Sequence, residues 1–474
     1  MKKKIAVFAN AWSDTIVQQV LEGLRSEAGK TNTDIYLFLT YVSAWAQTVD
    51  NVSQLNLFRH PDPNDFEGIV IFTNTFNTEA EMEAIRQIVR CAKVPVISLE
   101  VHLEGAIFIG SENHRGMYEL TRHLIMEHNV RDVVYVAGIE GNEEDAVRRR
   151  AVEMALAENG LEIRDIIPTD FGYYKAEERV RHWIEEGKDI PDAFICANDF
   201  EAIGVCTALQ NHGLEVPWDV IVTGFDRIKE GTMTFPMLSS VSRNWFEMGQ
   251  EACRVLLEWD GQTCGDFEKI FESKFVPSES CGCVPAAEDE KYRSERIRNA
   301  YVNTTDEILM DGFFQNLKVV LDRATVKEDL YNLAGDILQG NTAFLGPDLA
   351  ICTEPGFFEI SESDYPEEIH HYSRVMDVLF QKKAKHKLAP STFESAMLIP
   401  ALEENPDTSD IYMFVPLQFQ RYTIGYAVCK NDLKMLYERR LYRWINNMSG
   451  VLVMLRRAIE MRKLRRQLEE KDTK

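Results

Sequence analysis

The sequence predicts an α/β protein with two lobes built on parallel sheets, followed by a smaller α+β domain flanked by long helices. From residue 5 to about 285, short apolar runs alternate with amphipathic helical stretches, which is the pattern of parallel strands connected by helices. The alternation runs through two successive series, and each series is long enough for one lobe. Beyond residue 286 this alternation ends, and segments with helical periodicity flank a few expected strands.

The composition is that of a multi-domain globular protein. The chain has 474 residues, of which 45% are hydrophobic, and its formal net charge is −24. Such an acidic balance disfavours a surface that neutralises nucleic-acid phosphates over most of the chain. No run approaches the roughly 18 apolar residues that a membrane-spanning helix needs. Nine cysteines at this density are typical of a cytoplasmic protein rather than of a disulfide-stapled secreted domain.

The first series begins with a strand at 5–10 and a helix at 14–28, which ends at Gly29. The further elements expected in this lobe are strands at 34–40, 68–72, 94–99 and 107–109, and a helix through 85–89. The second series has expected strands at 132–137, 165–169, 193–196 and 220–223, and helices at 145–159, 176–186 and 201–212. Parallel sheets place ligand-binding groups in the loops that leave the carboxyl ends of their strands. The relevant loops are 10–14, 73–77, 138–145, 170–174, 198–199 and 224–226.

Those loops carry a resemblance. Ala197-Asn198-Asp199 and Thr223-Gly224-Phe225-Asp226, together with segments 94–98, 109–116 and 216–220, resemble the effector-binding module of the Lac/Gal repressor family in order and spacing. That module is itself similar to type I periplasmic sugar-binding proteins. The resemblance covers about residues 4–285. It implies two lobes with chain crossings near residue 110 and within 240–285, which close over a small polar ligand in the cleft between them.

The resemblance places the family's effector-contacting side chains on Arg148, Asn198 and Asp226, and its stacking aromatic on Phe171. A sugar-like ligand needs fixed donors and acceptors for its hydroxyls and an apolar surface for its ring face, which these residue types supply. Structural alternatives exist for three of them. Arg148 belongs to a run of three arginines that solvent could cover, Asp226 follows Gly224 in a turn, and Asn198 is well placed to cap the next helix.

In the first lobe, the candidate ligand-binding residues lie on the strand-end loops and are weaker assignments, because their family equivalents vary with the ligand. They are Asn10, Trp12, Ser13, Asp14, Asn74 and Phe76. One departure from the family concerns DNA. The repressors carry a helix-turn-helix before this module, whereas the first strand here starts at Ile5, so we expect no direct DNA binding by this chain.

The downstream half does not resemble the repressors. Residues 286–325 read as a linker and a long signalling helix, and 326–432 as a sensor domain with strands at 395–399, 411–416 and 422–430. The last two strands resemble the central hairpin of a GAF or PAS-like domain, although a generic α+β interaction domain remains the alternative. Residues 433–474 predict a helix whose apolar stripe suits a two-helix coiled coil. The stripe consists of Val451, Met454, Ala458, Met461, Leu464 and Leu468.

No catalytic or metal-binding motif is assigned. The sequence contains no nucleophile elbow, dinucleotide-binding or phosphate-binding glycine loop, and no zinc-protease motif. Cys281-Gly282-Cys283 stands as a single pair, and we interpret it as the exposed end of a terminal strand rather than as a metal site. We therefore expect no cofactor and no metal.

The expected function is that of a cytoplasmic, homodimeric regulatory protein that binds a small polar metabolite of sugar-like chemistry, without enzymatic activity or membrane attachment. Lobe closure would pass through the helices to a transcriptional or second-messenger output. Three alternatives remain open at this point. The chain could be an extracytoplasmic solute receptor, the sensory half of a diguanylate cyclase or similar signalling enzyme, or an enzyme on the same scaffold.

Overall fold

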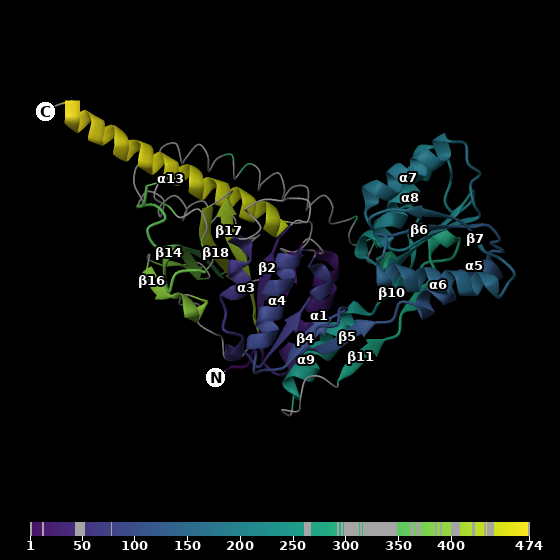
Figure 1. The fold of residues 1–474 in the computed structure, drawn as a ribbon, viewed down its shortest axis with the longest axis horizontal. Coiled ribbons are helices and arrows are strands. Elements are labelled where there is room, and N and C mark those ends of the chain that lie inside the picture. Colours follow the sequence, from purple (N-terminus) through teal and green to yellow (C-terminus); the bar gives the residue numbers. More distant parts are fainter. Residues whose placement is uncertain are drawn as a thin grey trace. The chain divides into compact units, whose positions relative to one another are not determined.

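A computed structural model of the chain describes residues 2–11, 14–42, 53–76, 78–259, 267–291, 348–361, 371–383, 386–388, 391–399, 408–419, 422–430 and 440–472, with several single residues between these ranges. The chain forms two compact units (Figure 1). Unit 1 comprises Met1–Ile109, Trp245–Lys269 and Asp306–Lys474, and unit 2 comprises Gly110–Asn244 and Ile270–Thr305. The signalling helix expected within 286–325 lies mostly outside the described residues.

Unit 1 begins with five parallel strands in the order β5-β4-β3-β1-β2. Their bounds are β1 Lys4–Asn10, β2 Asp34–Thr40, β3 Gly68–Ile71, β4 Val96–Leu99 and β5 Ile107–Ser111. Almost every strand residue is buried, because helices cover both faces of a parallel sheet. The α-helices of this part are α1 Asp14–Lys30, α3 Asn56–Arg59, α4 Glu79–Cys91 and α9 Trp245–Leu257.

Helices α1 and α9 pack backbone against backbone. A Cβ atom on Gly23 would lie 1.9 Å from the carbonyl oxygen of Phe246, and one on Gly249 would lie 2.0 Å from that of Val20. Only glycine permits this approach. The contact fixes α9, which follows the second series in the sequence, within unit 1.

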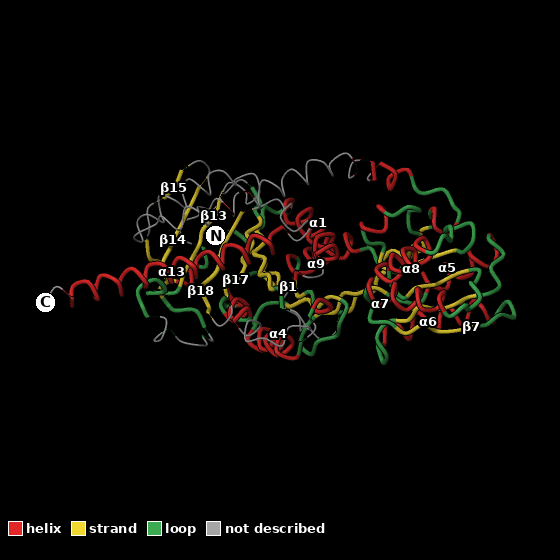
Figure 2. Tube along the Cα trace, turned by 90° about the horizontal axis from the view of Figure 1, so that it is seen from above, coloured by secondary structure: helices red, strands yellow, loops and turns green. Residues whose placement is uncertain are grey.

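The downstream strands continue the same sheet. Strand β17 (Ile411–Phe419) pairs in parallel with β2, and the order then runs β17-β18-β13-β14-β15 with antiparallel neighbours. Figure 2 labels these five downstream strands in one group. Together with β11 (Glu268–Phe271) at the opposite edge, the described residues form a sheet of 12 strands. The remaining bounds are β13 Asp348–Thr353, β14 Val375–Lys383, β15 His386–Leu388, β16 Ser391–Glu394, which pairs with β14, and β18 Tyr422–Lys430.

Some downstream predictions change. The hairpin expected at 411–430 is present as β17 and β18, whereas the strand expected at 395–399 is wrong, since Ser395–Met397 forms a short 3-10 helix directly after β16. Strands β13 and β14 were not predicted, because the first strand expected in this region was at 395–399. The boundary expected at 286–325 separates two stretches of sequence whose strands share one sheet.

A shared aromatic core joins these two stretches. The ring of Phe38 stacks on Phe414 with 4.6 Å between centroids, and Tyr36 stacks on the same ring at 5.7 Å. At the start of the paired strands, the Ile35 amide donates to the Asp410 carbonyl at 2.9 Å, and the Asp410 amide donates to Oδ1 of Asp34 at 2.7 Å. Burial of such rings contributes about 1.5–3 kcal/mol each, so the downstream strands stabilise the first lobe directly.

The C-terminal helix α13 (Arg440–Asp472) packs against β17 with its first half only. Leu441, Trp444 and Leu455 are buried, and Oγ of Ser449 accepts a hydrogen bond from the Gln418 amide at 3.2 Å. From Met461 onward the large apolar side chains of the helix are exposed. The exposed fractions are 56% for Met461, 49% for Leu464 and 60% for Leu468.

Unit 2 is a six-stranded sheet of order β12-β10-β9-β8-β6-β7, in which only β12 is antiparallel to its neighbour. One hydrophobic core lies under helices α5 and α6, and a second lies under α7 and α8, so the sheet is covered on both faces. The bounds are β6 Val133–Ala137, β7 Ile163–Pro168, β8 Ala193–Cys196, β9 Ile221–Asp226, β10 Ser239–Ser242 and β12 Lys274–Val276, with α5 Arg115–Glu127, α6 Glu143–Ala157, α7 Tyr173–Glu185 and α8 Asp199–Asn211.

The predicted fold class is confirmed by these two α/β units with mainly parallel sheets. None of the helices among the described residues combines the length and the apolarity that crossing a bilayer requires.

Candidate functional site

The candidate site of unit 2 begins at helix α6, which directs one arginine of a run of three inward. Asn142 caps this helix, because its side chain accepts a hydrogen bond from the Asp145 amide at 2.9 Å. Asp145, Arg148 and Val152 follow one another at three- and four-residue steps and share the buried face. Arg148 is only 2% exposed, so the alternative of a solvated arginine is wrong.

Three hydrogen bonds hold the guanidinium of Arg148. Its Nε donates to Oδ1 of Asn113 at 3.0 Å, and Nη1 donates to the Ala197 carbonyl at 2.9 Å. Nη2 donates to Oε2 of Glu144 at 2.9 Å. The guanidinium carbon also lies 3.9 Å from the centre of the Phe225 ring, which adds a cation–π contact. The arginine is thus fixed at the carboxyl ends of β8 and β9.

A second buried arginine joins this group. Arg243 directly follows β10 and is 4% exposed. Its Nη2 donates to Oε1 of Glu144 at 2.9 Å, and Nε donates to Oγ of Ser111 at 2.8 Å. Burial alone would raise the pKa of Glu144, but Arg243 and Arg148 outweigh it and lower that pKa to about 2. One carboxylate therefore holds two guanidinium groups.

Asp226 completes the group at the end of β9. Its Oδ1 lies 3.4 Å from Nη1 of Arg243, and its backbone φ is +100°, in a region that side chains rarely adopt. The next residue, Arg227, also has a positive φ of 49°. Burial raises the pKa of Asp226, while Arg148 and Arg243 lower it in part. Two consecutive residues with positive φ at a strand end are the kind of backbone strain that clusters at binding sites.

The acid that supports Asp226 is Asp199, which is 1% exposed. Its carboxylate accepts hydrogen bonds from Oγ of Ser240 at 2.6 Å and from the Ile228 amide at 2.7 Å, so it holds the turn that carries Asp226. A Cβ atom on Gly224 would lie 2.2 Å from Oδ1 of Asp199, and this explains the glycine in that strand. Burial raises the pKa of Asp199 well above its usual value.

Asn198 caps helix α8. Its Oδ1 accepts from the Glu201 amide at 2.9 Å, and the Glu201 side chain accepts from the Asn198 amide at 3.1 Å, which forms a capping box. The capping alternative stated from the sequence is therefore what the structure contains. Nδ2 of Asn198 has a further partner, because it donates to the Phe171 carbonyl at 3.0 Å. Asn198 thus joins the ends of β7 and β8.

Phe171 lies in a close-packed turn after β7. Its φ is +63°, and its ring fills the space beside Gly138, where an added Cβ atom would lie 2.1 Å from the ring atoms. The ring is partly buried and packs on the core under α5 and α6. The four residues that the resemblance assigned in this lobe, Arg148, Asn198, Asp226 and Phe171, therefore all lie at the carboxyl ends of the unit 2 strands.

The candidates in unit 1 have a different role. Asn10 is fully buried, and its Nδ2 donates to the Val42 carbonyl and to Oε1 of Glu81, each at 2.8 Å. Phe76 is 7% exposed, and its ring lies edge-on to Phe58 with 5.6 Å between centroids in the core of the unit. Both residues therefore hold the strand-end loops together through contacts within the unit.

The structure describes the other unit 1 candidates only in part. Asn74 is partly exposed in the short 3-10 helix Thr73–Thr75. Asp14 begins α1, whereas Trp12, Ser13 and the side chain of Asp14 lie outside the described residues.

Sequence reasoning missed Arg243, Glu144 and Asn113. Arg243 follows the strand Ser239–Ser242. This strand contains three serines, so the sequence did not predict a strand there or a strand-end loop after it. Glu144 stands four residues before Arg148, a spacing that places the two side chains together on a helix and could have indicated the pair. Asn113 is distant in sequence from all of them, and no local signal marks it.

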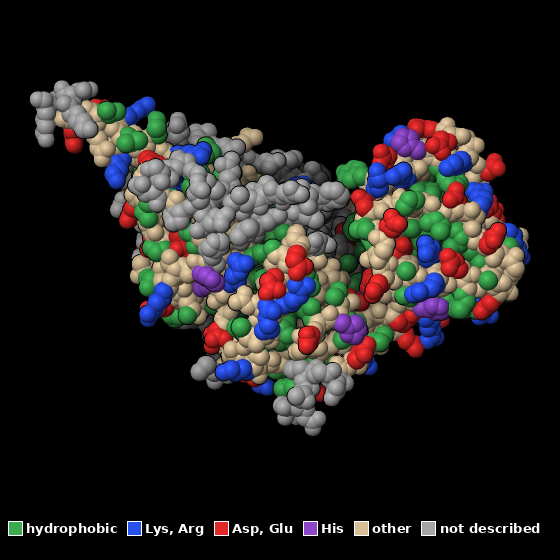
Figure 3. All heavy atoms as spheres, in the orientation of Figure 1, with side chains coloured by type: hydrophobic (Ala, Val, Ile, Leu, Met, Phe, Trp, Pro, Cys, Tyr) green, Lys and Arg blue, Asp and Glu red, His purple; other side chains and the backbone are tan. Residues whose placement is uncertain are grey.

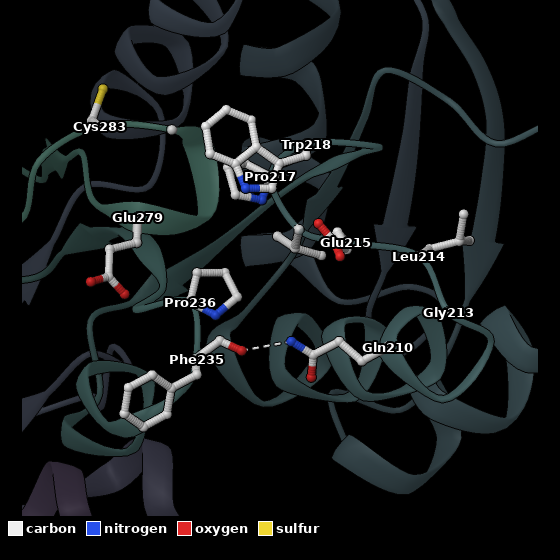
Figure 4. A pocket seen from close by; sticks show the side chains of 12 residues that line it. Gln210, Gly213, Leu214, Glu215, Pro217, Trp218, Phe235, Pro236, Glu279 and Cys283 are labelled. Atoms are coloured by element: carbon white, nitrogen blue, oxygen red, sulfur yellow. Dashed lines mark hydrogen bonds between the residues drawn. The ribbon is translucent and has the colours of Figure 1, made fainter.

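A separate hollow of about 680 Å³ lies at the amino-terminal ends of the parallel strands of unit 2, away from the candidate site (Figure 4). Trp218 and Pro217, from the loop before β9, and Phe235 and Pro236, from the segment before β10, line it. The exposed fraction of Trp218 is 83%. Because these loops precede their strands, the hollow contains none of the residues predicted to bind ligand.

Comparisons with known proteins match part of the chain. Residues 121–262 match the family described as periplasmic binding protein-like domain. The chain is 28% identical over 212 residues to catabolite control protein A of Priestia megaterium, which covers 44% of this chain and 61% of the relative. It is 33% identical over 145 residues to the HTH-type transcriptional repressor PurR of Glaesserella parasuis, which covers 30% of this chain and 42% of the repressor.

Solved structures give a fold-level likeness. A LacI family transcriptional regulator from Enterococcus faecium with bound ribose is 20% identical, with a TM-score of 0.47, over 60% of this chain and 100% of that one. A dimeric Lac repressor is 18% identical, with a TM-score of 0.48, over 60% of this chain.

The matched segment spans 61% of catabolite control protein A and 42% of the PurR repressor, so the chain covers less than two thirds of either relative. Residues 121–262 are therefore similar to the periplasmic binding protein-like domain, and part of the chain is similar to a transcriptional repressor.

Proposed function

We propose that this protein is a regulatory ligand sensor whose unit 2 binds a small polar metabolite, sugar-like in chemistry, through Arg148, Asp226 and Asn198. The observation that carries the proposal is the pair of buried arginines, Arg148 and Arg243, held by Glu144 at the carboxyl ends of parallel strands. Buried charges are costly to maintain for stability alone, and fixed guanidinium and carboxylate groups suit vicinal hydroxyls.

Arg243 extends the set of residues predicted from the sequence. Because it bridges Glu144 and Asp226, it orients the carboxylate that would accept a hydrogen bond from a ligand hydroxyl. Phe171 supplies the apolar surface on the same side of the sheet. Asn10, Trp12, Ser13, Asp14, Asn74 and Phe76 remain proposals for the first lobe, and the buried positions of Asn10 and Phe76 favour a supporting role for these two.

The signal would leave the ligand module through the sheet of unit 1. Ligand-driven movement of the lobes requires that the ligand binds one arrangement more tightly than the other. In unit 1, β2 pairs with β17, and β17 packs on α13, so a displacement of the first lobe passes directly to the downstream strands and the C-terminal helix. The antiparallel strands β13, β14, β17 and β18 support a GAF or PAS-like assignment for this region.

The output would be transcriptional or second-messenger regulation through a partner in the cytoplasm. The exposed residues Met461, Leu464 and Leu468 of α13 support a homodimer through a two-helix seam. On the face seen in Figure 3, acidic and basic side chains are interspersed over unit 2 rather than gathered by sign, which supports the absence of direct DNA binding by that surface.

A binding screen on the full chain tests the proposal. Pentoses, hexoses, polyols and nucleosides are screened by thermal shift, and hits are titrated by calorimetry. At least one compound should bind, and Arg148→Met should weaken binding at least 100-fold, because it removes a fixed donor from the site. Arg149→Ala, one position along the same helix and directed outward, is the matched control and should bind normally. Binding that survives unchanged in Arg148→Met, or a panel without any hit, contradicts the proposal.

A further inference from the structure

Four side chains with metal-binding atoms meet at the amino edge of the unit 2 sheet. The ligand atoms of His123, His128, Cys281 and Cys283 all lie within 4.8 Å of one another. Nε2 of His123 lies 3.1 Å from Nε2 of His128, and Sγ of Cys283 lies 3.4 Å from each of these nitrogens. None of the four residues belongs to the proposed ligand site, which lies at the carboxyl ends of the strands.

The backbone brings the four residues together from two segments. His123 lies in α5 and His128 follows the end of that helix, whereas Cys281 ends a short 3-10 helix, Glu279–Cys281, and Cys283 follows it. Gly282 between the cysteines has φ +93°, which lets the chain turn so that both sulfur atoms face the histidines.

Hydrogen bonds fix the cysteine segment before any ligand binds. The Cys283 amide donates to the Ser278 carbonyl at 3.0 Å, and the Gly282 amide donates to the Glu279 carbonyl at 2.8 Å. The Cys281 amide donates to Oγ of Ser239 at 3.2 Å, which ties the segment to β10. The cluster is therefore held by rigid elements rather than by a loose loop.

We infer that His123, His128, Cys281 and Cys283 form a structural Zn²⁺ site. With Zn–S of about 2.3 Å and Zn–N of about 2.0–2.1 Å, a tetrahedral site separates its ligand atoms by about 3.4 Å for two nitrogens and about 3.6 Å for nitrogen and sulfur. The separations of 3.1 and 3.4 Å agree with this geometry. Thiolate and imidazole ligands select Zn²⁺ over Mg²⁺ and Ca²⁺, which prefer oxygen.

Four protein ligands leave no open position, so the site is structural rather than catalytic. Binding releases the protons of the two thiols to solvent, and the metal is held by two thiolates and two neutral imidazoles. The ion would fasten the segment that follows β12, where the chain leaves the last strand of unit 2, to the end of α5. It also lies beside the hollow of Figure 4, because Gly282 and Cys283 are among the lining residues of that hollow.

Metal analysis of the full chain tests this inference. The protein is stripped with a chelator under reducing conditions, reconstituted with Zn²⁺, desalted and analysed by inductively coupled plasma mass spectrometry. We expect about one Zn²⁺ per wild-type chain, and a loss of most of it in Cys283→Ser and in His128→Ala. Two controls should keep the full metal content: Cys91→Ser, an exposed cysteine of unit 1, and His182→Ala, an exposed histidine of unit 2.

Cobalt gives a second readout that does not depend on variants that fold. Titration of the stripped wild-type chain with Co²⁺ should produce the intense visible bands of a tetrahedral site and a thiolate charge-transfer band, and one equivalent of Zn²⁺ should remove both. Wild-type protein that keeps no Zn²⁺ after reconstitution would overturn the inference. So would Cys283→Ser protein with undiminished metal, or octahedral Co²⁺ spectra without a thiolate band.

Discussion

The two units use their strand-end residues in opposite ways. In unit 1, Asn10 and Phe76 lie where the resemblance predicted ligand contacts. The Asn10 side chain is hydrogen-bonded within the unit, and the Phe76 ring packs on another ring of the same unit. In unit 2, Arg148 and Arg243 are also buried, but their charged guanidinium groups meet on Glu144 at the carboxyl ends of the strands. On this basis we propose that unit 2 provides most of the binding energy for a ligand, whereas unit 1, whose sheet extends into the downstream strands, would provide the route by which binding is reported.

The largest expected effect concerns that route. Phe414→Ala removes a ring that stacks on Phe38, and it should lower the free energy of unfolding by about 3–5 kcal/mol. Because β17 and β2 share one core, amide exchange should accelerate in β1 and β2 as well as in β17. Denaturant unfolding and hydrogen exchange measure both effects, with Met397→Ala, which is 64% exposed, as the control. Faster exchange confined to residues 348–430 would show that the two regions are independent.

The next effect concerns a buried acid of unit 2. Burial raises the pKa of Glu201 to about 8, against a usual value of 4.5, so the folded state binds this proton more tightly than the unfolded state does. Its contribution to stability is fully present below about pH 4.5 and is lost as the pH rises to 8. We expect a loss of about 4–5 kcal/mol, since the two pKa values differ by about 3.5 and each pKa unit corresponds to about 1.4 kcal/mol.

Glu201→Gln isolates this contribution. Glutamine keeps the capping box with Asn198 but does not ionise, so the variant should lack this part of the pH dependence. Unfolding free energies measured from pH 5 to 8 for both proteins provide the comparison. Parallel curves for wild type and variant would contradict a raised pKa at Glu201.

Arg148→Met tests the charged cluster through stability as well as binding. The substitution leaves Glu144 with only Arg243 as an ionic partner, and the free energy of unfolding should fall by about 2–3 kcal/mol. Arg149→Ala should change it by less than about 0.5 kcal/mol, because its ion pair with Glu153 is exposed. Equal effects of the two variants in denaturant unfolding would show that Arg148 stabilises unit 2 no more than an exposed arginine does.

The smallest effect separates the two roles of Asn198. Asn198→Ala removes the cap of α8 and should cost about 1 kcal/mol. Asn198→Asp keeps a capping oxygen but loses the amide that donates to the Phe171 carbonyl, so it should preserve thermal stability and still weaken ligand binding. If Asn198→Asp binds the hits of the screen as tightly as wild type, Asn198 is a cap and nothing more.

The fold of the ligand module was readable from the sequence because its strands and helices follow strict periodicities, as in 132–137 and 145–159. The downstream strands were harder. β13 is buried along almost its whole length, and β14 includes Asp377 and ends in two lysines, so neither shows the alternation of a half-buried strand. The pairing of β2 with β17 joins residues about 376 positions apart, and no local pattern encodes such a contact.

The site was readable where a residue follows a strand, as Asn198 and Asp226 do. The sequence did not predict which of several similar residues would be buried in the site. Arg148 differs from Arg149 and Arg150 only in the helix face that it occupies, and Asn10 differs from an exposed asparagine only in being enclosed by Val42 and Glu81. The histidines that meet Cys283 are more than 150 residues away in sequence, which explains why the cysteine pair appeared isolated.

A crystal structure of the full chain with the tightest compound from the screen tests the central claim most directly. We predict that hydroxyl oxygens of the ligand lie within hydrogen-bond distance of Arg148, Asn198 or Asp226, and that Phe171 lies against an apolar face of the ligand. A ligand bound instead in the hollow beside Trp218, or held only by unit 1, would contradict it.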